Sequence, residues 1–125
     1  MSEEKIKVLL VEDDPMIVDM YKMRLEEEGY EVIVTDKGSE AIEIAQKQEP
    51  AIILLDVILP EVDGFSVLGT LQEESKTKKI PVIMLTNLGQ EADREKGIKL
   101  GAREYFVKAE HTPTDIINAV KKLIS

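Results

Sequence analysis

The chain has 125 residues, no cysteine, and a formal net charge of −9 from 16 basic and 25 acidic side chains. This length supports one domain with its own hydrophobic core, and the missing cysteines exclude disulfides, thiolate metal sites and cysteine catalysis. The acidic balance disfavours long-range attraction to nucleic acid or anionic lipid, so a cation or a partner with a basic surface is expected instead.

The first fourteen residues, MSEEKIKVLLVEDD, predict a cytoplasmic protein without membrane insertion. Their apolar run is short and is followed directly by three acids, whereas a signal peptide or a membrane helix needs a longer apolar segment with different flanks. A chain without cysteine also fits a reducing compartment.

Short β-branched runs alternate with longer amphipathic stretches in the first half of the chain. Asp14 and Pro15 are favourable residues for the cap and first position of a helix, and Gly29 is a favourable stop. The apolar run at residues 51–57 is typical of a strand that is buried on both faces. The predicted strands span residues 6–11, 31–35 and 51–57, and the predicted helices span 15–29 and 39–48.

The same alternation continues after a loop that is marked by Pro60 and by the Asp63-Gly64 pair. Thr112 and Pro113 are favourable residues for the start of the last helix. The predicted strands of this half span residues 81–86 and 104–108, and the predicted helices span 65–74, 91–100 and 114–124.

The helix predicted at residues 91–100 contains an internal glycine, Gly97, and few apolar residues. An internal glycine costs about 1 kcal/mol relative to alanine, so we expect this helix to be the least stable of the five. A merely exposed helix explains the pattern as well as a helix that takes part in a functional surface.

Five strands that alternate with five helices predict an α/β fold with a parallel sheet that is covered by helices on both faces. This is a doubly wound arrangement, in which ligands bind beyond the carboxyl ends of the strands. We therefore ask which polar residues lie at those ends.

Polar side chains follow four of the five predicted strands. Glu12, Asp13 and Asp14 follow the first, Asp56 lies near the end of the third, Thr86 ends the fourth, and Lys108 ends the fifth. Taken singly, each has an ordinary explanation, such as a helix cap for Asp14 or a solvated lysine for Lys108. Together they suggest a metal site, because carboxylates from neighbouring strands repel one another unless a cation such as Mg²⁺ lies between them.

A carboxylate beside such a metal can act as a nucleophile toward phosphorus and form an aspartyl phosphate, if cations neutralise the charge of the product. The sequence thus predicts that Glu12 and Asp13 hold the metal and that Asp56 attacks. Thr86 and Lys108 are expected to contact the phosphoryl oxygens.

Four motifs resemble the receiver domain of two-component response regulators, the CheY-like family: LLVEDD, LLDVILPEVDG, VIMLT and GAREYFVK. The resemblance covers essentially the whole chain, from Val8 to Ile124. It implies a flavodoxin-like, five-stranded sheet with the strand order 2-1-3-4-5. It also implies that residues 1–125 form a single receiver domain with no output domain.

The resemblance implies that Asp56 accepts a phosphoryl group from a sensor histidine kinase or a histidine phosphotransfer protein. The implied Mg²⁺ ligands are Glu12, Asp13, Asp56 and the backbone carbonyl of Ile58. Tyr105 takes the place of the aromatic residue whose rotation accompanies movement of the threonine, Thr86.

By the same likeness, phosphorylation changes the surface formed by the helix at residues 91–100, the strand at 104–108 and the helix at 114–124. That surface binds a downstream effector protein. Such a protein is not an enzyme in the usual sense, because it catalyses only its own phosphorylation and dephosphorylation. We expect no direct nucleic-acid binding, and either a monomer or a phosphorylation-dependent dimer.

Two positions depart from the family pattern. Ala109 follows Lys108, where receivers usually have a proline joined through a cis peptide, and Asn87 replaces a residue that is usually very small. These departures leave open a degenerate receiver that binds partners without phosphorylation. A small flavin-binding or phosphatase-type enzyme on the same fold is a further alternative, although the acids of the EDDP segment would repel a flavin phosphate.

Overall fold

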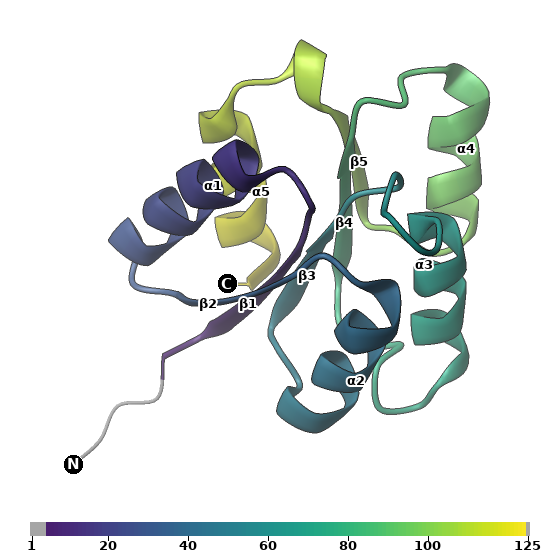
Figure 1. Cartoon of the computed structure of the whole chain (residues 1–125), viewed down its shortest axis with the longest axis horizontal. Coiled ribbons are helices and arrows are strands. Elements are labelled where there is room, and N and C mark those ends of the chain that lie inside the picture. Colours follow the sequence, from purple (N-terminus) through teal and green to yellow (C-terminus); the bar gives the residue numbers. More distant parts are fainter. Residues whose placement is uncertain (1–4, 125) are drawn as a thin grey trace.

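Five parallel strands form the centre of the structure, a computed structural model that describes residues 5–124 (Figure 1). Their order is β2-β1-β3-β4-β5, as expected for the doubly wound, flavodoxin-like α/β fold. The strands are β1 (Lys7–Val11), β2 (Glu31–Thr35), β3 (Ile52–Leu55), β4 (Val82–Thr86) and β5 (Glu104–Val107). The helices are α1 (Pro15–Glu27), α2 (Gly38–Gln48), α3 (Gly64–Glu73), α4 (Glu91–Lys99) and α5 (Pro113–Ile124).

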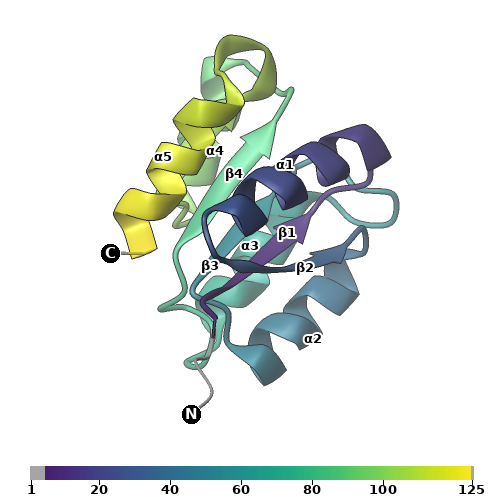
Figure 2. The same cartoon turned by 90° about the vertical axis from the view of Figure 1, so that its left-hand side faces the viewer.

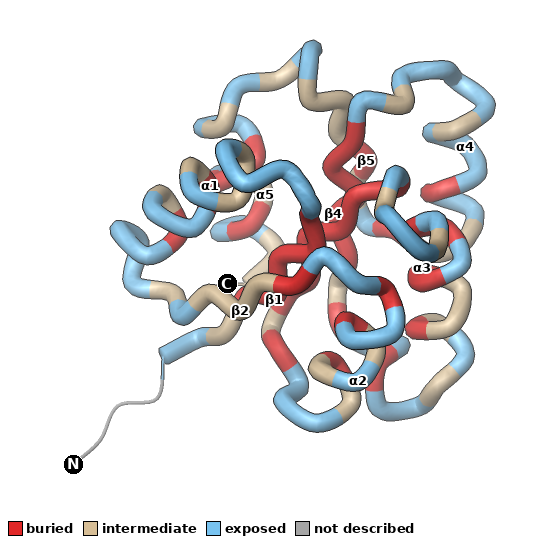
Figure 3. Tube along the Cα trace, viewed as in Figure 1, coloured by how far each residue is buried: buried red, intermediate tan, exposed pale blue. Residues whose placement is uncertain are grey.

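The helices cover the two faces of the sheet in separate groups. Figure 2 looks onto the face covered by α1 and α5, while α2, α3 and α4 lie on the opposite face. Successive strand residues point to opposite faces, so Leu10 packs with Leu25 of α1, whereas Leu9 packs in the core that includes Leu68 of α3. Figure 3 shows the consequence as buried strands between helices with exposed outer surfaces.

Strand β3 is buried on both faces, as its apolar run predicts, and each of its four residues has zero exposure. The strand is shorter than the predicted span of residues 51–57, however, because the pairing ends at Leu55. Asp56 therefore lies just beyond the strand, where its backbone nitrogen still donates to the carbonyl of Val11 at 3.1 Å. This position takes its carboxylate out of the core and to the edge of the sheet.

Local signals place the helix ends close to where the sequence predicts them. The side chain of Asp14 accepts from the backbone nitrogen of Met16 at 3.0 Å and so caps α1, with Pro15 at the first position. The helix ends at Glu27 rather than at residue 29, and Gly29 adopts the positive φ of 93° that turns the chain away.

The segment after β5 differs from the prediction in one respect. The strand stops at Val107, and Lys108–Glu110 form a short 3₁₀ turn instead of extending the strand to residue 108. Within the described residues no peptide bond is cis, so the chain passes through Ala109 in the ordinary trans form.

Across residues 5–124, every helix falls short of the length and apolar character that a bilayer-crossing segment requires.

The turn after α3 depends on a buried hydroxyl group and yields a stability prediction. Thr77 has zero exposure, and its Oγ1 donates to the carbonyl of Leu71 near the end of α3 at 2.6 Å. Thr77→Val keeps the shape but leaves this carbonyl without the donor. We expect a loss of about 1 to 3 kcal/mol in the free energy of unfolding, measured by urea denaturation.

Thr70→Val is the matched control for this prediction. Thr70 donates to the carbonyl of Ser66 within α3, at a partly exposed position where the hydrogen bonds of the helix also serve that carbonyl. The control should change stability by less than about 0.5 kcal/mol. Equal losses in the two variants would contradict the role given to the Thr77 hydroxyl.

Candidate functional site

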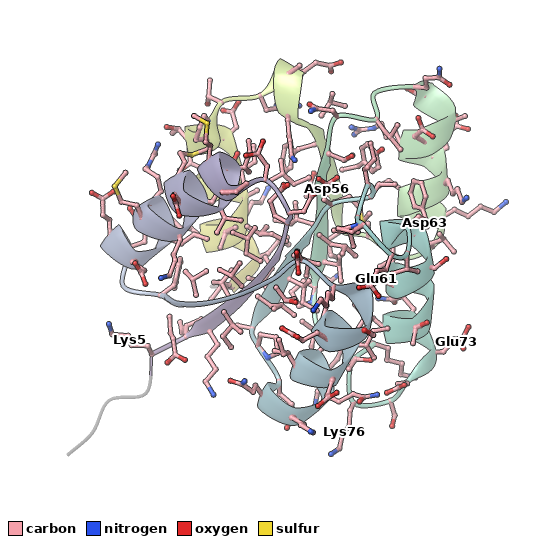
Figure 4. All side chains as sticks on the ribbon, in the orientation of Figure 1. Lys5, Asp56, Glu61, Asp63, Glu73 and Lys76 are labelled. Atoms are coloured by element: carbon pink, nitrogen blue, oxygen red, sulfur yellow. The ribbon has the colours of Figure 1, made fainter. Side chains whose placement is uncertain are left out.

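Most of the residues proposed from the sequence lie at one edge of the sheet, at or beyond the carboxyl ends of the strands, whereas Tyr105 lies within β5. Asp56, labelled in Figure 4, lies where the chain leaves β3 near the middle of this edge. Because β1 and β4 are the neighbours of β3, residues that follow those strands come close to Asp56. The strand order thus brings residues that are far apart in the sequence close together in one cluster.

Three carboxylates form the first part of this cluster. Glu12, Asp13 and Asp56 each offer an oxygen atom, and these atoms lie within 4.8 Å of one another. Glu12 and Asp56 are buried, with exposures of 3% and 6%, whereas Asp13 is exposed. Asp14 serves as the helix cap and is outside this group.

The buried carboxylate of Glu12 is held in place by the start of the following loop. Its Oε2 accepts from the backbone nitrogens of Asp13 and Asp14, each at 3.1 Å. Burial raises the pKa of Glu12 above its ordinary value, although Lys108 and the backbone of Asp14 act in the opposite direction. A cation near this group would favour its charged form.

Lys108 supplies the positive charge of the site. Its Nζ donates to Oε1 of Glu12 and, at 3.0 Å, to Oδ2 of Asp56. Burial by itself lowers the pKa of Lys108, but its hydrogen bonds to the two carboxylates, and their charges, outweigh burial and leave the pKa raised. Lys108 therefore reaches the cluster from the 3₁₀ turn although Ala109 replaces the usual proline.

The loop between β3 and α3 fits closely around Asp56. The backbone nitrogen of Ile58 donates to Oδ1 of Asp56 at 3.1 Å, which brings the backbone of Ile58 next to the carboxylate. Gly64 donates to the carbonyl of Val57 at 2.7 Å, and a Cβ at position 64 would lie 2.1 Å from the carbonyl oxygen of Asp56. The sequence predicts a turn at Gly64, but only the structure shows that the glycine is required by this contact.

Thr86 and Tyr105 are joined through the backbone of Leu88. The backbone nitrogen of Leu88 donates to Oγ1 of Thr86 at 3.3 Å, and the hydroxyl of Tyr105 donates to the carbonyl of Leu88 at 2.7 Å. Both side chains are buried, and burial raises the pKa of Tyr105 to about 12. No sequence signal identifies Leu88 as the link, because the contacts are made by its backbone.

The chemistry of the donor groups suits a hard divalent cation. Carboxylate and carbonyl oxygens are the ligands that Mg²⁺ prefers, and it binds through few protein ligands while keeping several waters. The cluster offers one exposed and two buried carboxylates, with the backbone of Ile58 beside them. These residues therefore fit a magnesium ion.

Comparison with solved structures shows the same fold in signalling proteins. The chain is 30% identical to the chemotaxis protein CheY4 of Vibrio cholerae, with a TM-score of 0.86 over 96% of this chain and 99% of that one. It is 27% identical to the receiver domain of the sensor histidine kinase PA1611 of Pseudomonas aeruginosa, with a TM-score of 0.86 over 97% and 98% of the two chains. The latter structure holds a magnesium ion in its active-site cleft.

Sequence comparison places this chain beside longer regulators. It is 42% identical over 108 residues to the probable transcriptional regulator ycf27 of Porphyra purpurea, an alignment of 86% of this chain and 43% of that protein. The chain thus spans about half the length of the curated relatives it matches. A family model for the response regulator receiver domain matches residues 8–121. Since this match runs through every strand and reaches into α5, the chain belongs to the receiver domain family of two-component response regulators.

Proposed function

We propose that this receiver is a phosphorylation switch in which Asp56 accepts a phosphoryl group from a histidine kinase or a histidine phosphotransfer protein. The observation that carries the proposal is the setting of the Asp56 carboxylate. This carboxylate is buried and belongs to a cluster of acids that suits a metal. It also pairs with the ammonium group of Lys108, which can neutralise a phosphoryl oxygen. Glu12, Asp13, Asp56 and the backbone carbonyl of Ile58 would hold Mg²⁺.

The transfer itself asks little of the protein beyond position and charge. A carboxylate oxygen of Asp56 forms a bond to phosphorus while the bond from phosphorus to the donor imidazole nitrogen breaks, and the electron pair stays on the imidazole. Lys108 donates a hydrogen bond to Oδ2 of Asp56, so its ammonium group is placed to neutralise the negative charge of the phosphoryl group. Bound Mg²⁺ would neutralise further charge on the phosphoryl oxygens.

The switch would follow from the added charge. A phosphoryl group brings roughly −1.5 to −2 charges at pH 7, which can recruit the Thr86 hydroxyl as a donor. Because Thr86 is tied to Tyr105 through Leu88, its position affects β5 and the neighbouring helices. We propose that the surface of α4, β5 and α5 changes in this way and binds an effector protein.

The wider setting follows from the same proposal. The protein would act in the cytoplasm as a single receiver domain, alone or as a dimer formed on phosphorylation, and would reach DNA only through another protein or segment. It would catalyse only its own phosphorylation and dephosphorylation. The acids that follow β1 argue against a flavin-binding role, since they would repel a flavin phosphate.

The direct test is phosphorylation by acetyl phosphate in the presence of Mg²⁺. We expect intact-mass spectrometry to show one added phosphoryl group on the wild-type chain and none on Asp56→Asn. Asp36→Asn is the matched control, because Asp36 is an exposed acid that follows β2 and lies outside the acid cluster. A wild-type chain that stays unmodified, and also fails to bind beryllofluoride, would favour an interaction module that works without phosphorylation.

Magnesium binding has its own prediction. Mg²⁺ at one hundred times its dissociation constant should raise the free energy of unfolding by about 2.7 kcal/mol, because it binds only the folded cluster. Asp13→Asn should greatly reduce this gain, whereas Asp14→Asn should keep it, since asparagine still caps α1. Urea denaturation at constant ionic strength measures both. A gain that survives in Asp13→Asn would place the metal elsewhere.

Removal of the positive charge of Lys108 should reduce the free energy of unfolding by an amount that depends on pH. We expect Lys108→Met to lower the free energy of unfolding by about 3 kcal/mol at pH 7, because Glu12 and Asp56 then stay buried without a counter-charge. The pKa of Glu12 is already raised, and losing Lys108 would raise it further, so the folded variant takes up protons before the unfolded chain does. The loss should therefore shrink as the pH falls toward 5.

Lys47→Met is the control for this charge removal. Lys47 pairs with Glu43 on the exposed surface of α2, where the same substitution should change stability by less than about 0.5 kcal/mol. Unfolding curves for both variants at pH 7 and pH 5 give the comparison. A loss in Lys108→Met that does not depend on pH would argue that packing, not charge, holds the lysine in place.

A further inference from the structure

The buried contact between helix α4 and the rest of the protein is made by a glycine. Gly97 is the buried residue of this helix, whereas the nearest large apolar side chain, Ile98, is 43% exposed. Glycine in the interior of a helix is unfavourable, so a helix with so little apolar burial would gain from alanine at this position. The surroundings of Gly97 explain why alanine would not fit.

The space beside Gly97 is filled by an aromatic ring. A Cβ at position 97 would lie 2.8 Å from Cδ2 and 3.2 Å from Cε2 of Tyr105, and 3.6 Å from Cε1 of Phe65. The first distance is too short for a real contact, and the Tyr105 ring is only 1% exposed and cannot move freely. A methyl group at position 97 must therefore displace either the ring or the helix.

Two polar contacts keep α4 at this close distance. Nη1 of Arg94 donates to the backbone carbonyl of Tyr105 at 3.0 Å, and Nζ of Lys96 lies 4.7 Å from the centre of the Phe65 ring. One contact ties α4 to β5, and the other ties it to the start of α3. The helix cannot retreat from Tyr105 without weakening both.

The position of the Tyr105 ring matters because its hydroxyl reaches the loop that follows β4. This hydroxyl donates to the carbonyl of Leu88, and the backbone nitrogen of Leu88 in turn donates to Oγ1 of Thr86. A hydroxyl that accepts from Leu88 still has its one proton with which to donate to another acceptor. The inward Tyr105 ring thus supports the arrangement in which Thr86 can donate to a phosphoryl oxygen on Asp56.

We propose that Gly97 is a positioning residue of the switch. Because Gly97 has no side chain, α4 packs closely against the buried ring of Tyr105. That ring then keeps Leu88 and Thr86 in the arrangement that receives the phosphoryl group. This inference rests on the proposed phosphorylation of Asp56. It gives α4 a role that depends on close approach, not on apolar burial. It also predicts that a substitution remote from Asp56 changes phosphoryl binding.

The test compares two glycines that both lie inside helices. Gly97→Ala should weaken the binding of beryllofluoride with Mg²⁺ by about tenfold, because the extra methyl group depopulates the competent arrangement. Gly69→Ala in α3 is the matched control, since a Cβ there meets no atom within 4 Å. The control should bind beryllofluoride as the wild type does and should unfold at a higher urea concentration.

A second pair of variants identifies the ring as the cause. In a Tyr105→Val background the ring atoms that would meet the methyl group are gone, while a β-branched residue keeps β5 favourable. There Gly97→Ala should leave beryllofluoride affinity unchanged and should raise the urea midpoint, because alanine is the better helix former once the ring is gone. If Gly97→Ala alone is too unstable to assay, recovery of folding in the Tyr105→Val background supports the same conclusion.

The outcomes separate this inference from the function on which it rests. A wild-type chain that does not bind beryllofluoride overturns the proposed phosphorylation of Asp56. A wild-type chain that binds it, with Gly97→Ala equal to the wild type in affinity, overturns only the role of Gly97. An affinity loss or unfolding of Gly97→Ala that persists in the Tyr105→Val background also overturns that role, because the ring would not be its cause.

Discussion

The shared ammonium group of Lys108 is the interaction on which the site depends. Glu12 and Asp56 are two buried carboxylates close together, and burying such charges without a partner is costly. Lys108 lies beyond β5, and β4 separates β5 from β3 in the sheet. Its side chain therefore reaches over the end of β4, where Thr86 lies. The ammonium group of Lys108 thus joins residues that follow three strands, β1, β3 and β5.

Close backbone approach is the second constraint around the site. At Gly64 the absence of a side chain lets the loop after β3 fold back against Asp56, and at Gly97 it lets α4 pack on Tyr105. Between these two contacts lies Phe65, which follows Gly64 and whose ring faces both Gly97 and Lys96. The region that surrounds the carboxylate and the region proposed to bind an effector are therefore in direct contact.

Much of the architecture can be predicted from local pattern. The alternation of β-branched runs with amphipathic stretches gives all ten elements, and the acids, hydroxyl and amine at the strand ends indicate the chemistry of the site. The details that fail are those set by hydrogen bonding. Asp56 lies beyond β3 instead of within the predicted strand, and Lys108 begins a 3₁₀ turn instead of ending β5. Because Ala109 replaces the proline that usually follows the lysine, the sequence does not show that Lys108 still reaches the carboxylates.

The sequence by itself determined which groups are candidates for the proposed site: the acids after the first strand, the aspartate near the end of a doubly buried strand, the threonine and the lysine, because these follow from residue type and period. Only the tertiary structure decided how they meet. The order of the strands places Lys108 between two carboxylates, and backbone atoms of Leu88 connect Thr86 with Tyr105. The tertiary structure also changes the interpretation of Gly97. In an isolated helix this glycine would only lower helix stability, but in the folded protein it occupies a space too small for a methyl group. Such contacts join residues far apart in the chain, so no local pattern can encode them.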